Sequence, residues 1–404
     1  MRILVHDYAG HPYAVQLSRA LARRGHEVLH VYSSSNPMPQ GSLAKTESDP
    51  ATFQPCPISI GEKIQKAQFV KRRSQEIAHA RKVGEVMCEF KPDLILSGST
   101  PLDTQNHLWK VAKQCGAATA FWLQDLSGVA TEAVLRDKLP VVGRPIGRYY
   151  IQMEERLLRD SSAVVAISAD FVPVLTSCGV PRERIHVIEN WGPIDEVPVR
   201  PKINPWSQAM GLDQTFNFIY SGTLGMKHDP QILLRLAQAM DGRPAVRVVV
   251  ITEGIGRRWL EREKAALNLE RLLLLDFQPF ASVPDVMGAA DVLTAILEPS
   301  AGIFSVPSKV LSYLCSGRPL LLSVPPENLA ARIVQSVEAG LISHPGDVEA
   351  FVADAKILSD DPELRARMGR NGRAYAEATF DIERIADHFV SAFEGVVGRG
   401  NAGK

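Results

Sequence analysis

The chain has 404 residues, of which 45% are hydrophobic and 22% are charged, and its formal net charge is zero. These values are typical of globular proteins, and the length favours two domains over one. A chain with no net charge has no strong overall attraction to nucleic acid or to a membrane, so affinity of that kind requires a local patch.

The first half of the chain is predicted to alternate strands and helices. An apolar strand at 3–5 leads into a polar loop at 7–12, and the amphipathic helix that follows stops at Gly25. Further strands are predicted at 28–32, 94–96, 119–123, 164–167 and 185–188. Strands that alternate with helices indicate an α/β fold with a parallel, doubly wound sheet.

Four prolines between residues 192 and 206 are typical of a linker. A second strand, loop and helix follow at 216–220, 221–227 and 230–240. More strands are predicted at 246–251, 272–275, 292–296 and 320–323, and the chain ends in helices at 361–378 and 382–397. The two halves are therefore similar, and we expect a ligand between them, at facing carboxyl ends of the strands.

The cysteines and histidines predict no metal site and no disulfide framework. The five cysteines are scattered without a Cys-x-x-Cys pair, and no His-Glu-x-x-His motif occurs. The N-terminal apolar run is too short for a signal peptide. No apolar stretch reaches the roughly 18 residues that span a bilayer. We therefore expect a cytoplasmic protein, or one on the inner face of the plasma membrane.

Residues 305–319 (SVPSKVLSYLCSGRP) are the most informative stretch of the chain. They predict a loop of small residues, a helix that begins at Ser308, a stop at Gly317 and a strand beyond it. A helix N-terminus at the carboxyl end of a sheet favours a phosphate or a nucleotide-linked sugar. The alternative is an ordinary junction between a loop and a helix.

Several segments, taken in order, resemble the retaining GT-B glycosyltransferases of family 4, also called group 1. They are 21–28 (LARRGHEV), 163–168 (AVVAIS), 188–191 (IENW), 220–227 (YSGTLGMK) and 289–292 (AADV). Residues 307–319 are similar to the branch that assembles exopolysaccharide and lipopolysaccharide, including the colanic-acid type. The resemblance covers nearly the whole chain.

The resemblance implies two Rossmann-like domains that face a central cleft. It places an acceptor domain at 1–195 and a nucleotide-sugar donor domain at 205–381, with the C-terminal helix 382–404 crossing back to the first domain. The implied activity is that of a hexosyl- or other glycosyltransferase in surface polysaccharide assembly. The donor is UDP- or GDP-linked, the acceptor is a glycan or a polyprenyl-linked saccharide, and neither a metal nor a further cofactor is required.

Three positions depart from the family pattern. The family often has Glu-x7-Glu in the donor loop, and these positions hold Phe304 and Ser312 here. A serine bonds only one ribose hydroxyl well, whereas a carboxylate makes stronger, charge-assisted bonds. Thr223 stands where the family commonly has an arginine. The nucleotide is therefore held differently, or its site is weaker.

The resemblance assigns Lys227 to the leaving diphosphate, and Lys309 is a second candidate cation. Without a metal, cationic side chains and N–H groups must stabilise the diphosphate as the C1–O bond breaks. The alternative for each lysine is a solvated side chain on a helix, and for Glu298 a solvated loop residue. The other donor-binding candidates are Gly222, Thr223, Gly225, Glu298, Gly302, Ser305, Val306, Pro307 and Ser312.

Acceptor candidates follow two strands of the first half. Gly10 permits close approach of the backbone to a phosphate, and His11 is placed to touch the acceptor or the diphosphate. Gln124 and Asp125 occupy the place where the family often has a polar acceptor residue, and Asp125 is a candidate to orient or deprotonate the acceptor hydroxyl. The alternatives are a structural histidine and a helix cap.

The resemblance also implies retention of the anomeric configuration, with reaction on one face of the sugar and the leaving phosphate taking the proton. We find no closely spaced carboxylate pair of the kind that double displacement uses. Residues 63–82 are basic, with Ile64 and Phe69 among them, and predict contact with an anionic leaflet or, equally, a solvated helix.

Two other functions stay open. A nucleotide-sugar 2-epimerase uses the same fold and needs no acceptor. A non-catalytic nucleotide-sugar-binding protein would explain Thr223 and Ser312. A dehydrogenase is disfavoured because no Gly-x-Gly-x-x-Gly follows the first strand. No nucleic-acid partner is expected.

Overall fold

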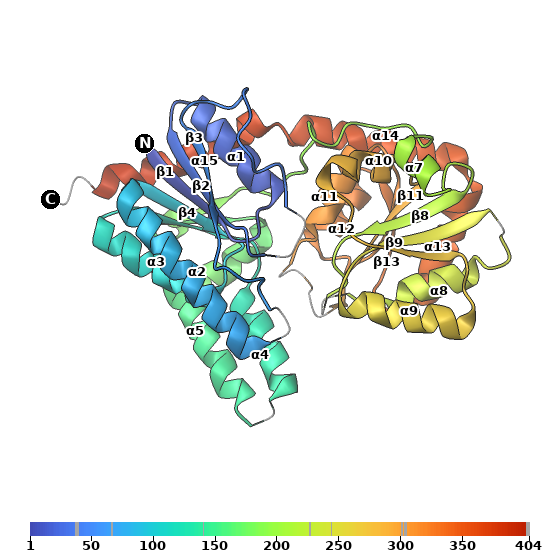
Figure 1. Cartoon of the computed structure of the whole chain (residues 1–404), viewed down its shortest axis with the longest axis horizontal. Coiled ribbons are helices and arrows are strands. Elements are labelled where there is room, and N and C mark those ends of the chain that lie inside the picture. The colour runs from blue at the N-terminus through green and yellow to red at the C-terminus, as the bar shows by residue number, and fades with distance from the viewer. Residues whose placement is uncertain are drawn as a thin grey trace. The chain divides into compact units, whose positions relative to one another are not determined.

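The computed structural model describes residues 1–36, 40–65, 68–139, 141–225, 228–243, 245–299, 302 and 305–400, without the side chains of 137, 138 and 397–400. The chain divides into two compact units, one made of Met1–Glu189 with Ile382–Lys404 and one of Asn190–Asp381. Figure 1 shows a sheet in each unit.

The first unit contains a parallel sheet of seven strands in the order β3-β2-β1-β4-β5-β6-β7. The strands are β1 (Arg2–Asp7), β2 (Glu27–Ser33), β3 (Phe53–Ile58), β4 (Leu94–Gly98), β5 (Ala118–Leu123), β6 (Ala163–Ala166) and β7 (Ile185–Val187). The helices are α1 (Pro12–Arg23), α2 (Phe69–Phe90), α3 (Leu102–Cys115), α4 (Ser127–Lys138), α5 (Gly143–Asp160), α6 (Val172–Ser177) and α15 (Ile382–Gly400).

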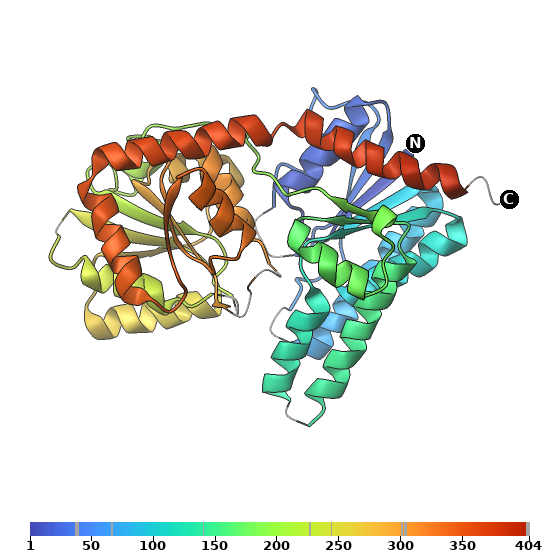
Figure 2. The ribbon, with the colours of Figure 1, turned by 180° about the vertical axis from the view of Figure 1, so that it is seen from behind.

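Both faces of this sheet are covered, with α1 and α15 packed together on one face and α2 beside α3 on the other (Figures 1 and 2). Burial on both faces explains the apolar runs at 3–5 in β1, 94–96 in β4 and 163–166 in β6. The edge strand β3 contains Pro55 and Pro57 and was not predicted. Proline is tolerated there because an edge strand has one side without ladder bonds.

The second unit contains a parallel sheet of six strands in the order β10-β9-β8-β11-β12-β13. The strands are β8 (Phe216–Ser221), β9 (Val246–Ile251), β10 (Leu272–Leu275), β11 (Val292–Ile296), β12 (Leu320–Ser323) and β13 (Gly340–Ser343). The helices are α7 (Pro205–Ala209), α8 (Gln231–Ala239), α9 (Ile255–Leu267), α10 (Val283–Gly288), α11 (Ser308–Cys315), α12 (Leu329–Ser336), α13 (Val348–Asp360) and α14 (Pro362–Thr379).

The prediction of an α/β fold with two doubly wound parallel sheets is confirmed. In each sheet the strand order reverses beside the unit's first strand, between β1 and β4 and between β8 and β11. Ligands of such sheets bind outside the carboxyl ends of the strands at this reversal. The loops after these four strands are therefore where the site is to be sought.

Candidate functional site

The turn after β1 is built around Asp7. Its carboxylate accepts hydrogen bonds from the backbone N–H of His11 and from the His11 ring at Nδ1, 2.9 Å away. Burial alone would raise the pKa of Asp7, but the contacts with His11 outweigh it and the pKa lies below its ordinary value. Asp7 is therefore an anion that fixes the orientation of the imidazole.

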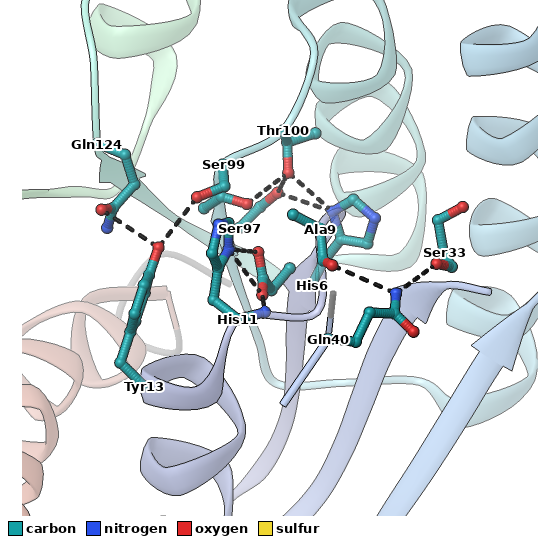
Figure 3. A network of polar contacts seen from close by, with 12 residues as sticks. His6, Ala9, His11, Tyr13, Ser33, Gln40, Ser97, Ser99, Thr100 and Gln124 are labelled. Carbon is teal, nitrogen blue, oxygen red and sulfur yellow. Dashed lines mark hydrogen bonds and ion pairs between the residues drawn. The ribbon is translucent and has the colours of Figure 1, made fainter. Parts of the chain in front are cut away.

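Gly10 is required in this turn for two reasons. Its φ is +77°, in the left-handed region that favours glycine. A Cβ atom there would also lie 2.9 Å from the Gln40 side chain, which donates to the carbonyls of Ala9 and Ser33 (Figure 3). The glycine predicted from sequence is thus needed by the turn itself.

Tyr13 connects the carboxyl ends of β1, β4 and β5. Its hydroxyl lies 3.2 Å from Ser99 Oγ and donates to Gln124 Oε1 at 3.4 Å (Figure 3). Its ring stacks on His11, with centroids 5.0 Å apart. Burial, and then the charge of Asp7, raises the pKa of Tyr13 well above its ordinary value, so the hydroxyl stays protonated. The predicted residues His11 and Gln124 are brought together through this tyrosine.

Beneath this layer lies a buried histidine pair that the sequence did not reveal. His6 Nε2 is 3.1 Å from His79 Nε2. His6 Nδ1 contacts Ser97 and Thr100 at 3.2 and 3.0 Å (Figure 3). Burial, and then His79, lowers the pKa of His6 well below its ordinary value. Burial lowers the pKa of His79 to about 4. The pair is therefore neutral and links α2 to the turn after β4.

The loop after β5 is held by a carboxylate from α5. Glu154 accepts hydrogen bonds from the backbone N–H groups of Ser127 and Gly128 at 2.8 and 3.0 Å, at the start of α4. Burial raises the pKa of Glu154 to about 7, against the opposing effect of these two bonds. Asp125, predicted to act on the acceptor, lies in the three-residue connection between β5 and α4 that Glu154 anchors.

In the second unit, Lys309 reaches the turn after β8. A Cβ atom at Gly222, whose φ is +141°, would lie 2.8 Å from Lys309 Nζ. The amino group donates to the Tyr220 hydroxyl and lies 3.8 Å from the centre of that ring. Burial lowers the pKa of Lys309 to about 7. Among the residues that the structure describes, no carboxylate pairs with this amine.

The same turn is tied to its own strand. The Tyr220 hydroxyl donates to the carbonyl of Thr223 at 2.8 Å, and the Thr223 side chain is exposed. The N–H of Gly225 donates to His228 Nδ1 at 3.2 Å. Lys227, predicted as the leaving-group cation, lies outside the described residues, as does Phe304.

The loop before α11 is fixed by Asn328. Its side-chain amide donates to the carbonyls of Gly302 and Ser305 at 2.6 and 2.7 Å. The loop ends in Val306 and Pro307, and α11 begins at Ser308 as predicted. Ser312 lies on α11 and Glu298 follows β11, both half-buried. The first turn of α11 thus carries Lys309 toward Gly222, which unites two segments that lie 87 residues apart.

The family comparison follows the same division of the chain. Residues 9–191 match the model of a glycosyl transferase 4-like domain, and residues 204–375 match glycosyl transferases group 1. The chain belongs to the glycosyltransferases. The two matches together span most of its length. Comparison with curated proteins finds no significant match.

Solved structures similar to this glycosyltransferase share its two-unit GT-B fold. HepE from Anabaena, solved with UDP-glucose, has a TM-score of 0.69 at 18% identity over 98% of this chain and 99% of its own. Sucrose-phosphate synthase from Thermosynechococcus elongatus has a TM-score of 0.73 at 15% identity over 99% and 100%. A protein described as a UDP-N-acetylglucosamine 2-epimerase from Listeria monocytogenes has a TM-score of 0.63 at 11% identity over 98% and 96%.

The basic segment 63–82 of this glycosyltransferase is largely engaged within the first unit. Lys71 pairs with Glu62 at 2.9 Å, and Arg73 makes two bonds to Asp103 at 3.0 Å. Arg72 pairs with Glu76, and Lys82 donates to the carbonyl of Ser59. Carboxylates thus offset the charges of Lys71, Arg72 and Arg73.

Among the described residues, no group of three or more His, Cys, Asp or Glu side chains could hold a metal ion. No helix within the described ranges has the length and apolarity that crossing a bilayer demands.

Proposed function

We propose that this protein is a retaining glycosyltransferase that needs no metal and moves a sugar from a UDP- or GDP-linked donor to a glycan or polyprenyl-linked saccharide. We assign donor binding to the second unit and acceptor binding to the first. The likeness of residues 307–319 to the exopolysaccharide branch favours a role in surface polysaccharide assembly. Such an acceptor places the enzyme at the inner face of the plasma membrane.

The observation that carries the proposal is Lys309 against the Gly222 turn. A buried amine without a carboxylate partner among the described residues is poorly stabilised, and an arriving diphosphate supplies the missing charge. The turn after β8 and the helix start at Ser308 offer N–H groups to the same anion. HepE, which shares the fold, was solved with UDP-glucose bound. This supports a nucleoside diphosphate sugar as the ligand.

The proposed chemistry needs charge stabilisation more than a nucleophile. As the sugar C1–O bond breaks, its electron pair stays on the diphosphate, and Lys309 and Lys227 stabilise that charge. The acceptor oxygen bonds to C1 on the same face, and its proton passes to the leaving phosphate. Asp125, His11 and Gln124 orient the acceptor hydroxyl. Glu298, Ser305 and Ser312 contact the donor.

Thermal shifts with UDP, GDP and their common sugars test the donor assignment. A ligand that binds only the folded state raises the melting temperature by mass action. The Lys309→Met and Lys227→Ala variants should lose most of the shift, whereas Lys356→Met, an exposed lysine of the same unit, should keep it. Equal shifts in all four proteins would refute the assignment.

Two alternative functions are each favoured by a specific observation. The Listeria protein of the same fold favours a 2-epimerase, and incubation with donor alone would then yield the epimer. Thr223 and Ser312 favour a non-catalytic binding protein, which would bind nucleotide sugar without transfer to any acceptor. Formation of a glycosylated product from donor and a lipid-linked acceptor excludes both.

A further inference from the structure

The helices α4 and α5 form a close antiparallel hairpin in the first unit. Three glycines lie between them: a Cβ at Gly143 would be 2.0 Å from the Leu135 carbonyl oxygen, and one at Gly147 would be 2.5 Å from Glu132. A Cβ at Gly128 would be 2.9 Å from Glu154. Helices that approach this closely leave little freedom for relative motion. The hairpin therefore presents its end as a preformed surface.

Apolar side chains at the end of the hairpin are exposed and do not pack into the core of the first unit. Val141 is 86% exposed, Val142 50% and Leu139 41%, and Tyr149, farther along α5, is 51% exposed. In Figures 1 and 2 the hairpin projects beyond the sheet of the first unit. Single exposed apolar residues are ordinary, but a contiguous group at a projecting end marks an interaction site.

Positive charge surrounds this apolar end. Residues 132–149 contain four basic and two acidic residues, a net charge of +2 in a chain whose total is zero. Arg144 and Arg148 are exposed, and neither has an acidic partner among the residues with described side chains. Along α5, Val142 and Arg148 are about 9 Å apart by the helical rise. Arg144 thus follows the apolar residues within one turn, and Arg148 and Tyr149 follow one to two turns after Val142.

The start of α2 is joined to α5 through Asp103 of α3. Arg73 and the Tyr150 hydroxyl both bind Asp103, at 3.0 and 2.7 Å, which joins α2 to α5 (Figure 1). One turn before Arg73, Phe69 is 44% exposed and Val70 is 81% exposed. We call the residues Phe69, Val70, Leu139, Val141, Val142, Arg144, Arg148 and Tyr149 the hairpin surface.

We propose that the hairpin surface docks the first unit on an anionic lipid bilayer. Valine and leucine enter the boundary between headgroups and acyl chains, arginines meet anionic headgroups, and tyrosine lies at the interface. A second copy of the chain is a poorer occupant because it would bring the same arginines together. The inference extends the proposed function by locating the membrane contact outside residues 71–82, where Lys71, Arg72 and Arg73 are paired with carboxylates. It does not depend on donor binding.

Vesicle flotation tests the proposal with the full chain. Wild type should bind phosphatidylglycerol-containing vesicles and leave pure phosphatidylcholine unbound, and salt should weaken the binding. The Val141→Glu/Val142→Glu variant should bind at least tenfold more weakly. Arg144→Gln and Arg148→Gln should each cost about fivefold. Ile255→Glu, at a 71% exposed position of the second unit, is the matched control and should bind like wild type.

Circular dichroism and the nucleotide thermal shift show whether each variant is folded and still binds donor, so failure of docking is distinguished from failure of the proposed function. No binding of wild type to anionic vesicles would overturn the proposal. So would equal binding by the wild type and the double glutamate variant. A concentration-dependent dimer that the double variant abolishes, without vesicle binding, would assign the surface to a second copy instead.

Discussion

Lys309 is the residue on which the donor proposal depends most. Its amine is buried against Tyr220, and burial lowers its pKa to about 7. The unfolded chain holds this proton up to the ordinary lysine pKa of about 10.4. Between these two pKa values the unfolded state binds more protons than the folded state. Lys309 therefore lowers the free energy of unfolding near pH 7, and this loss disappears as pH rises.

Replacement of Lys309 by methionine should therefore stabilise the protein without nucleotide. We expect a gain of about 2 kcal/mol at pH 7, after a discount for the partly exposed side chain. The gain should shrink toward zero as pH approaches about 10. Urea unfolding between pH 6.5 and 10 measures it. A difference that stays constant with pH, or a less stable methionine variant, would contradict a buried uncompensated amine.

At the scale of elements, long apolar strands were predictable and contacts between distant segments were not. The strands β1, β5, β8 and β9 each contain a run of mostly apolar residues that is visible in the sequence, and these predictions are confirmed. The strand β3 was missed because its two prolines are tolerated only at an edge, and edge position depends on the tertiary order of strands. The short strand β13 was also missed.

Prediction of the candidate site has the same limit, because contacts between distant segments could not be predicted from the sequence. Gly10, His11, Gln124 and Lys309 could be selected because they follow predicted strands or begin a predicted helix. Tyr13 and Glu154 could not, because their roles depend on which elements pack together. Asp7 was the exception with a readable signal, since a carboxylate four residues before a histidine at a strand end can bind its ring.

Helix packing in the second unit should be sensitive to one glycine. A Cβ at Gly369 in α14 would lie 2.2 Å from the Gly317 carbonyl oxygen, whereas one at Gly395 in α15 meets nothing within 4 Å. We expect Gly369→Ala to lower the free energy of unfolding by about 1–3 kcal/mol. Gly395→Ala should raise it by up to about 1 kcal/mol through helix propensity. Denaturant unfolding compares them, and equal effects of the two substitutions would be inconsistent with this packing.

The packing of α2 on α3 can be tested through two cysteines that no sequence motif pairs. Cys88 Sγ and Cys115 Sγ are 3.5 Å apart, close enough for a disulfide after a small movement. Diamide, a two-electron oxidant of thiols, should join them and raise the melting temperature, because the link closes a long loop. Peptide mapping by mass spectrometry should find this pair and not one with Cys315, which is buried. Recovery of both thiols unlinked would argue against the packing.

At the scale of the whole molecule, the C-terminal helix belongs to the N-terminal unit. In α15, Phe389 is fully buried and meets Trp122 of β5 with ring centroids 5.2 Å apart. Arg23 at the end of α1 pairs with Glu383, and Arg24, which follows it, pairs with Asp387, each at 2.7 Å. Because α15 completes the first unit, that unit cannot finish folding until residues 382–400 have been synthesised.

Each unit should therefore respond to loss of its own core residue. Phe389→Ala should destabilise the first unit by about 3–5 kcal/mol, and Phe351→Ala, fully buried in α13, should do the same to the second. Hydrogen exchange with mass spectrometry should show faster exchange in β5 for the first variant and in β8 for the second. Equal loss of protection in both units from either substitution would show that the units share one core.

The central claim is that the buried amine of Lys309 binds the diphosphate of the donor. Calorimetric titration with UDP at pH 8, in buffers of different ionisation enthalpy, measures the protons taken up on binding. At this pH the free amine is mostly neutral, and a bound diphosphate raises its pKa, so wild type should take up about one proton and Lys309→Met none. Equal uptake by the two proteins, or no uptake by wild type, would contradict the account.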